Sequence, residues 1–414
     1  MKFWKSSVWS FLSVGTRALT GLLINKFFAV QFGATGVSLL AHFQNLLNIF
    51  YLLANEGIHK GLIKVWSETD GDESRKMRHF WAGIILNCGL LLLGGVVLGV
   101  GESVISSDFL LEDGYVLWSA ILLLFIATQI GNFFGLSLLL AWEQIRWYAL
   151  LNLLGGLGAI ATLYAFQMPT IWQTLLVYHV GSSLGFGATV WIVGRKLWKR
   201  KWLISAPKIQ QQDFLIPLSF LGMAASSNLL QRLGDFWIRT KAFEVFSEEV
   251  VGRWQALVKL SDSYVVMFSS TFIVIFFPRL SKVFSHKLKR KLFLREVTLL
   301  VLPLMLSLLT GVYLFREWLL TLLFSKEFLP AAIWMPYVVI GDFFRLSQYF
   351  LGQILLVAGK IKQFILIQVI FSAIYMAYAT VLVNTQQLDA LIELRMWTYI
   401  FATLVVFGVV RRWF

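Results

Sequence analysis

Arginine side chains within long apolar runs are the residues of this sequence whose type and spacing could do chemistry. Four of them stand out as candidates: Arg17, Arg232, Arg239 and Arg345. A charge at the centre of a bilayer costs at least about 2.5 to 3.5 kcal/mol, so such a side chain faces a partner or a water-filled cavity. Guanidinium groups match the oxygens of phosphate. We therefore expect these arginines to bind an anionic substrate, with phosphate or diphosphate favoured.

Acidic residues accompany the basic ones in the same runs. A base and an acid three residues apart share one helical face, and this spacing occurs in Arg232 with Asp235, Lys259 with Asp262, and Asp342 with Arg345. Such pairs can neutralise one another and hold helices together, or a carboxylate can take up a proton or a sodium ion. Both interpretations stay open. The candidates for ion coupling are Glu56, Asp235, Asp262 and Asp342.

Uncharged polar residues form stripes on the first two apolar runs, at spacings of three and four that place them on one helical face. Such stripes are typical of helices that line a cavity. The residues that we expect to line it are Asn25, His42, Asn45, Asn48 and Asn55 on these two runs, together with Gln255 and Lys259 on the run at 250–277. His42 could also be a proton site, although a hydrogen-bonded interior histidine is the commoner case.

The elements that must position these residues are membrane-spanning helices. Of the 414 residues, 58% are hydrophobic and 14% are charged, against about 25% charged in soluble domains, which excludes a water-soluble globule. Apolar runs bounded by polar clusters predict an all-α polytopic membrane protein with about twelve spans. We expect them at about 8–30, 37–64, 80–101, 115–141, 147–166, 171–194, 214–242, 250–277, 297–324, 331–357, 363–383 and 390–410. The first run carries Arg17 and Lys26, which favours a retained span over a cleaved leader.

The distribution of basic residues predicts the orientation of these spans. With the N-terminus inside, the inner segments carry 23 lysines and arginines and the outer loops carry two, Arg316 and Lys326. Because basic residues resist translocation, both termini are expected on the cytoplasmic side. The basic runs from Arg195 to Lys208 and from Lys282 to Arg295 are interpreted as anchors that touch anionic lipid head groups.

A basic stretch that contains Pro207 divides the chain into two sets of six predicted spans. We expect an N-terminal lobe at 1–196, a linker at 197–213 and a C-terminal lobe at 214–414. Leu138–Tyr148 weakly resembles Ile354–Phe364, at an offset of 216 residues. An even number of spans in each half predicts a parallel repeat, related by an axis along the membrane normal.

Several classes of function are disfavoured by composition and motifs. The net charge of +14 is explained by membrane topology, so no nucleic-acid partner is expected. The single cysteine, Cys88, excludes an intramolecular disulfide and a cysteine-based metal cluster. No GxxxxGK[ST] loop is present, so energy does not come from a nucleotide site on this chain. We expect no cofactor and no metal centre.

Four segments resemble one family of membrane transporters: Arg17-Ala-Leu-Thr-Gly-Leu-Leu-Ile-Asn-Lys26, Ala54-Asn-Glu-Gly-Ile58, Val251-Gly-Arg-Trp-Gln255 and Leu260-Ser-Asp-Ser-Tyr264. In them the chain resembles the Wzx flippases, in particular those of enterobacterial common antigen synthesis. This family belongs to the multidrug/oligosaccharidyl-lipid/polysaccharide exporter superfamily. The resemblance extends over essentially the whole chain.

The resemblance implies a V-shaped bundle of two six-helix lobes that works by alternating access in the bacterial inner membrane. The implied cargo is an undecaprenyl diphosphate-linked oligosaccharide, such as an O-antigen, common-antigen or exopolysaccharide repeat unit. Arg17 occupies the position of a basic residue thought to meet the diphosphate, and Asp262 and Asp342 match acidic positions. The implied partners are membrane lipids, a coupling proton or sodium ion and a polysaccharide polymerase, and we expect a monomer.

Two other classes of function stay open. One is a cation-coupled exporter of small molecules on the same fold. The other is a polytopic membrane glycosyl or acyl transferase, which would need paired carboxylates or a metal site in a sizeable outer loop. The longest outer loop, at about 102–114, has acids but no histidine, so we expect a transporter and not an enzyme.

Overall fold

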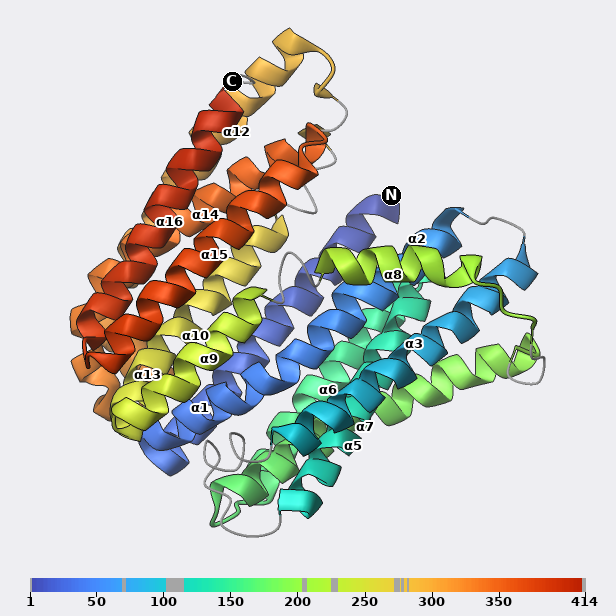
Figure 1. The fold of residues 1–414 in the computed structure, drawn as a ribbon, viewed down its shortest axis with the longest axis horizontal. Helices are drawn as coiled ribbons and strands as arrows, with labels where there is room; N and C mark the ends of the chain where they lie inside the picture. The colour runs from blue at the N-terminus through green and yellow to red at the C-terminus, as the bar shows by residue number, and fades with distance from the viewer. Residues whose placement is uncertain are drawn as a thin grey trace. The chain divides into compact units, whose positions relative to one another are not determined.

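The computed structural model describes residues 2–68, 72–101, 115–202, 207–224, 230–271, 276, 279–280 and 283–411, and all regular secondary structure in them is helical (Figure 1). The helices of the first part are α1 (Lys2–Leu52), the π-helix η1 (Leu53–His59), α2 (Lys60–Glu68), α3 (Glu73–Val100), α5 (Tyr115–Ala141), α6 (Ile145–Ala165) and α7 (Ile171–Lys199). They are followed by α8 (Gln212–Ala224), α9 (Leu230–Val245), α10 (Glu248–Thr271), α12 (Lys287–Leu314), α13 (Arg316–Leu323), the 3-10 helix η4 (Lys326–Trp334), α14 (Met335–Val357), α15 (Ile361–Asn384) and α16 (Leu388–Val410). The predicted all-helical class is confirmed for the described residues.

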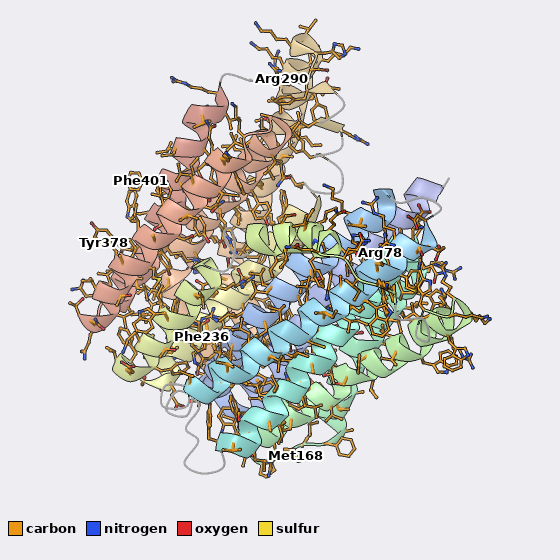
Figure 2. All side chains as sticks on the ribbon, turned by 45° about the vertical axis from the view of Figure 1, so that its right-hand side comes forward. Arg78, Met168, Phe236, Arg290, Tyr378 and Phe401 are labelled. Atoms are coloured by element: carbon orange, nitrogen blue, oxygen red, sulfur yellow. The ribbon has the colours of Figure 1, made fainter. Side chains whose placement is uncertain are left out.

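Nine helical segments among the described residues are long and apolar enough to cross a membrane. Large apolar side chains on them are exposed, as for Val100 (81%) and Val116 (77%). Figure 2 shows two more, Tyr378 and Phe401, at the periphery of the C-terminal helices. A soluble protein rarely exposes so much apolar surface, whereas lipid covers it at no cost. The number of twelve spans and the side of the termini stay predictions.

Gly33 breaks α1 into two helices, at the junction that the sequence predicts between its first two spans. The backbone of Gly33 has a φ of 62° and a ψ of −153°, a conformation that residues with a Cβ rarely adopt. A Cβ at this position would also lie 2.9 Å from Oε2 of Glu327. Both observations require a glycine at the turn between the two helices.

Contacts divide the chain into two compact units, which we call unit 1 (Met1–Thr20 and Phe43–Leu233) and unit 2 (Gly21–His42 and Gly234–Phe414). The segment Gly21–His42 is therefore packed with the C-terminal helices. Within unit 2, Nζ of Lys26 donates to the carbonyl oxygens of Thr321, at 3.1 Å, and of Phe324. These carbonyls lie at the end of α13, where a cation compensates the helix dipole.

Two glycines four residues apart bring helices of unit 1 into close contact. A Cβ on Gly57 of η1 would lie 2.8 Å from Cα of Leu221, and one on Gly61 of α2 would lie 2.7 Å from Cα of Pro217. Small residues at this spacing allow the backbones of membrane helices to approach. Here they allow α8 to pack against the end of the second predicted span that contains Gly57 and Gly61.

Candidate functional site

A buried ionic cluster lies between α10 and α14 in unit 2. The Asp342 side chain is 2% exposed, and its Oδ1 accepts a hydrogen bond from Oγ of Ser261 at 2.8 Å. Its Oδ2 accepts one from the hydroxyl of Tyr264. Nη1 of Arg345 donates to Oδ1 of Asp262 at 2.8 Å and lies 3.9 Å from Oδ1 of Asp342. The arginine thus bridges carboxylates on two different helices.

Helical spacing explains how these side chains meet. Asp342 and Arg345 are three residues apart on α14 and share one face. Ser261 and Tyr264 are likewise three residues apart on α10, next to Asp262, and the two helices pack against each other. The sequence predicts the pair of Asp342 with Arg345. The shorter bond of Arg345, to Asp262, crosses between helices, and a pattern within one helix cannot show it.

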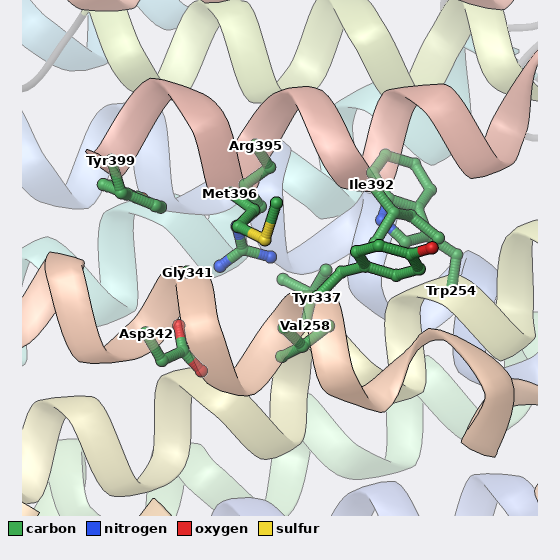
Figure 3. A pocket seen from close by; sticks show the side chains of 10 residues that line it. Trp254, Val258, Tyr337, Gly341, Asp342, Ile392, Arg395, Met396 and Tyr399 are labelled. Atoms are coloured by element: carbon green, nitrogen blue, oxygen red, sulfur yellow. The ribbon is translucent and has the colours of Figure 1, made fainter. Parts of the chain in front are cut away.

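A third helix brings a second arginine to this cluster. Figure 3 shows Arg395 extending from α16 toward Asp342 on α14, next to Tyr399. These residues line a cavity with Trp254 and Tyr337, and about 10 Å³ of it is open to the centre of a water molecule, which is room for about one water. The guanidinium carbon of Arg345 lies 5.7 Å from the centre of the Tyr399 ring.

Arg395 is not among the site residues predicted from the sequence. The signal was present, because Arg395 is a basic residue inside the apolar run at 390–410, as Arg17 is in the first run. With Arg395 the cluster holds two arginines and two aspartates, and these four formal charges sum to zero. Such a group can change its internal pairing when one carboxylate gains or loses a cation. The chemistry that it suits is ion uptake.

The arginines predicted to bind diphosphate have different surroundings. Arg239 on α9 is 6% exposed, and its Nη1 donates to the carbonyl oxygen of Ala41 at 3.3 Å. Arg232 is half-buried, and no salt bridge between described side chains includes it. Arg17 lies on α1, but its side chain is outside the described residues, as is that of Glu56 in η1.

The residues predicted to line a cavity fall into two groups. Four side chains are buried by neighbouring helices: Asn25, His42, Asn45 and Gln255. His42 stacks on Phe236 of α9 with 4.7 Å between the ring centres. Three more candidates, Asn48, Asn55 and Lys259, are partly exposed, as is Asp235. Their role in lining a cavity stays a prediction.

Comparison with known proteins supports the resemblance seen in the sequence. No model of a protein family matches the chain. Two curated proteins, each named lipid III flippase, from Escherichia coli (strain K12) and Shigella flexneri, are 24% identical to it over 432 residues. These alignments cover 100% of this chain and 99% of each relative. The predicted similarity to Wzx flippases of common-antigen synthesis is confirmed.

Solved structures share the fold. The lipid II flippase MurJ, in an inward closed conformation, superimposes with a TM-score of 0.72 at 12% identity, covering 98% of this chain and 87% of that one. The Vibrio cholerae MATE transporter VcmN, in its bent form, gives a TM-score of 0.64 at 14% identity, covering 99% and 96%. The predicted exporter-like fold is therefore confirmed.

Proposed function

We propose that this protein is a flippase that moves an undecaprenyl diphosphate-linked oligosaccharide from the cytoplasmic to the periplasmic leaflet by alternating access. The observation that carries the proposal is the end-to-end similarity to lipid III flippases, joined to the fold of a lipid II flippase. The protein is a multi-pass protein of the bacterial inner membrane. It is a transporter and not an enzyme. The two six-helix lobes, at 1–196 and 214–414, are part of this proposal.

The proposal assigns the diphosphate to Arg17 and Arg232. The half-buried setting of Arg232 supports this choice, because a guanidinium that no described carboxylate neutralises keeps its attraction for an anion. Arg239 and Arg345 already donate to a backbone carbonyl and to a carboxylate. For them we propose a secondary role, in which they add positive potential without a direct contact to phosphate.

The buried cluster of unit 2 is our candidate for ion coupling. Asp342 and Asp262 are joined through Arg345, so a proton or sodium ion taken up by one carboxylate would release the arginine to the other. A change of pairing between α10 and α14 gives two discrete states, as an alternating-access cycle requires. Glu56 and Asp235 stay alternative ion sites. We also propose that the protein is a monomer and that a polysaccharide polymerase uses the oligosaccharide that it delivers.

A flipping assay tests the proposed function. Purified protein in liposomes is given a labelled undecaprenyl diphosphate oligosaccharide, and its exchange between leaflets is followed with and without a pH gradient. We expect Arg17→Ala and Arg232→Ala each to slow exchange at least about tenfold, because each loses a charged hydrogen bond to phosphate. The matched control is Arg295→Ala, an exposed arginine on α12, which should flip normally. Full activity in both cavity variants would contradict the assignment of the diphosphate.

The second candidate function is an exporter of small molecules. It is favoured by the fold alone, since MATE transporters are among the structural neighbours. Drug resistance on overexpression, with surface polysaccharide unchanged in a deletion strain, would support this candidate and oppose the flippase.

A further inference from the structure

A basic groove with one aromatic side chain, Trp142, in its lining lies in unit 1, where α5 ends, α6 begins and the last turn of α7 passes. Its volume is about 560 Å³. The α5–α6 turn contributes one wall and α7 the other, and the lining includes the side chains of Trp142, Glu143, Gln144, Lys196, Lys199 and Arg200. No step of the proposed transport cycle uses this groove.

The cations of the groove are held against aromatic rings. The guanidinium carbon of Arg200 lies 5.3 Å from the ring centre of Trp142 and 5.7 Å from that of Trp202. Nζ of Lys196 lies 5.5 Å from the ring centre of Trp142 and donates to Oε1 of Gln144. These contacts fix the positions of two positive charges without neutralising them, because a ring carries no net charge.

Two acidic side chains reduce the charge of the groove only partly. Nη1 of Arg200 lies 3.3 Å from Oε2 of Glu73, and both side chains are about half exposed, at 42% and 53%. An ion pair so exposed to water is weak and easily exchanged. Glu143 is exposed on the α5–α6 turn. Three cations against two acids leave the groove positive, and one of the acids can be displaced from Arg200 by a stronger anion.

The backbone makes both walls of the groove rigid. Glu143 and Lys201 have φ values of 58° and 61°, a left-handed conformation that closes the ends of α5 and α7. The turn after α5 is held by a bond from N of Gln144 to O of Leu139 at 2.8 Å, and the one after α7 by a bond from N of Trp202 to O of Leu197 at 3.1 Å. The groove is therefore preformed.

The ends of three candidate spans predict that the groove lies at the edge of the bilayer. Helices α5, α6 and α7 are all candidate spans, and they begin or end at its walls. Trp191 and Trp198, on the face of α7 away from Lys196, Lys199 and Arg200, are 58% and 64% exposed, as is typical of rings at the membrane interface. The distribution of basic residues assigns this end to the cytoplasmic leaflet, where anionic head groups are found.

We propose that this groove binds the phosphate of an anionic phospholipid of the inner leaflet. Lys196 and Arg200 contact the phosphate, and Lys199 adds positive charge. The site is separate from the cargo site, and it makes the protein sensitive to the anionic lipid content of its membrane.

Native mass spectrometry of the full-length protein in detergent, titrated with phosphatidylglycerol, tests this proposal. We expect Lys196→Gln/Arg200→Gln to bind the lipid at least about tenfold more weakly, because two charge-assisted contacts to phosphate are lost. The matched control, Lys208→Gln/Lys289→Gln, removes two exposed charges outside the groove and should bind as the unaltered protein does. Lys199→Gln, a single change at an exposed side chain, should weaken lipid binding less than the double variant does. It tests the proposal if the double variant does not fold.

Two comparison ligands decide the nature of the site. Phosphatidylcholine, whose head group has no net charge, should bind at least about tenfold more weakly than phosphatidylglycerol. Equal binding of the two lipids, or equal affinity of the groove and control variants, would overturn the proposal. Glycerol phosphate that binds as tightly as the lipid would show a soluble phosphate ligand instead and overturn the lipid assignment. None of these readouts depends on flipping, so failure here leaves the proposed function standing.

Discussion

At the scale of the residue, Arg345 shows how a membrane charge is accommodated. Its guanidinium donates to Asp262 at 2.8 Å and to Oγ of Ser261 at 3.4 Å. Asp342 lies behind the arginine with two hydroxyl donors of its own. A buried charge is tolerated only when it is paired and hydrogen-bonded, and Arg345 and Asp342 both meet that condition.

Replacing Arg345 alone should therefore reduce the stability of the protein at least as much as replacing Arg345 and Asp262 together. We expect Arg345→Gln to lower the apparent melting temperature in detergent by several degrees, since it leaves two carboxylates, Asp262 and the buried Asp342, without the guanidinium between them. The double variant with Asp262→Asn should be no less stable than Arg345→Gln. A double-mutant cycle followed by tryptophan fluorescence measures the coupling, which should be about 1 kcal/mol because Asp262 is partly exposed. Strictly additive losses would mean that the two side chains do not interact.

Gln255 allows a second prediction at this scale. Its side chain is fully buried on α10, and neither amide atom has a hydrogen-bond partner among the described residues. Because an unsatisfied amide costs about 1 to 3 kcal/mol, Gln255→Met should leave the melting temperature unchanged or raise it. The same variant should flip cargo more slowly if the amide finds its partner in another state of the cycle. A marked loss of thermal stability would show that the amide is already satisfied.

At the scale of the element, close contacts and breaks position the helices that carry the charges. The π-helix η1 contains Asn55 and Glu56 and interrupts the second predicted span, and π-turns often mark functional positions in helices. Helix α8 packs over Gly57 within η1 and over Gly61 in the helix that follows it. The sequence predicts a continuous helix here, because hydrophobic periodicity does not distinguish a π-turn from an α-turn.

Enlarging Gly61 should separate α2 from α8. A side chain there meets the backbone at Pro217 and cannot be accommodated by a rotamer change, so we expect Gly61→Leu to destabilise the protein by about 1 to 3 kcal/mol. Gly89→Leu on α3 is the control, since nothing lies within 4 Å of a Cβ at that position. Thermal unfolding in detergent compares the two. Equal melting temperatures would show that α8 does not depend on the close contact.

At the scale of the whole molecule, the apolar surface requires a membrane and the charge distribution predicts one orientation in it. The 23 to 2 division of basic residues comes from the sequence, and the exposed valines, leucines and aromatic rings of the helices require lipid around them. The two units each contain their own packed helices. Their orientation in the bilayer is open to direct test.

Cysteine labelling tests this orientation. In a Cys88→Ala background, which removes the single native thiol, Ser285→Cys lies in a predicted cytoplasmic segment and Ser103→Cys in a predicted outer loop. A maleimide that cannot cross membranes should label position 103 in intact spheroplasts and position 285 only after permeabilisation, because basic segments stay inside. The reverse pattern would invert the topology and, with it, the leaflet assigned to the groove.

The sequence by itself determined the class of the protein, the approximate ranges of its helices and a break between the first two predicted spans, which the structure places at Gly33. These properties depend on local features: hydropathy, charge and the one residue type that tolerates a positive φ. The resemblance to flippases could also be found in the sequence, because short segments such as Ala54–Ile58 carry it. The tertiary structure decided that Arg345 bonds to Asp262 and that Arg395 joins them. It also decided that Gly21–His42 packs with the C-terminal helices. The physical reason is that a helical spacing specifies a face but not the helix that lies opposite, and the partner of a membrane charge is set by which faces pack together.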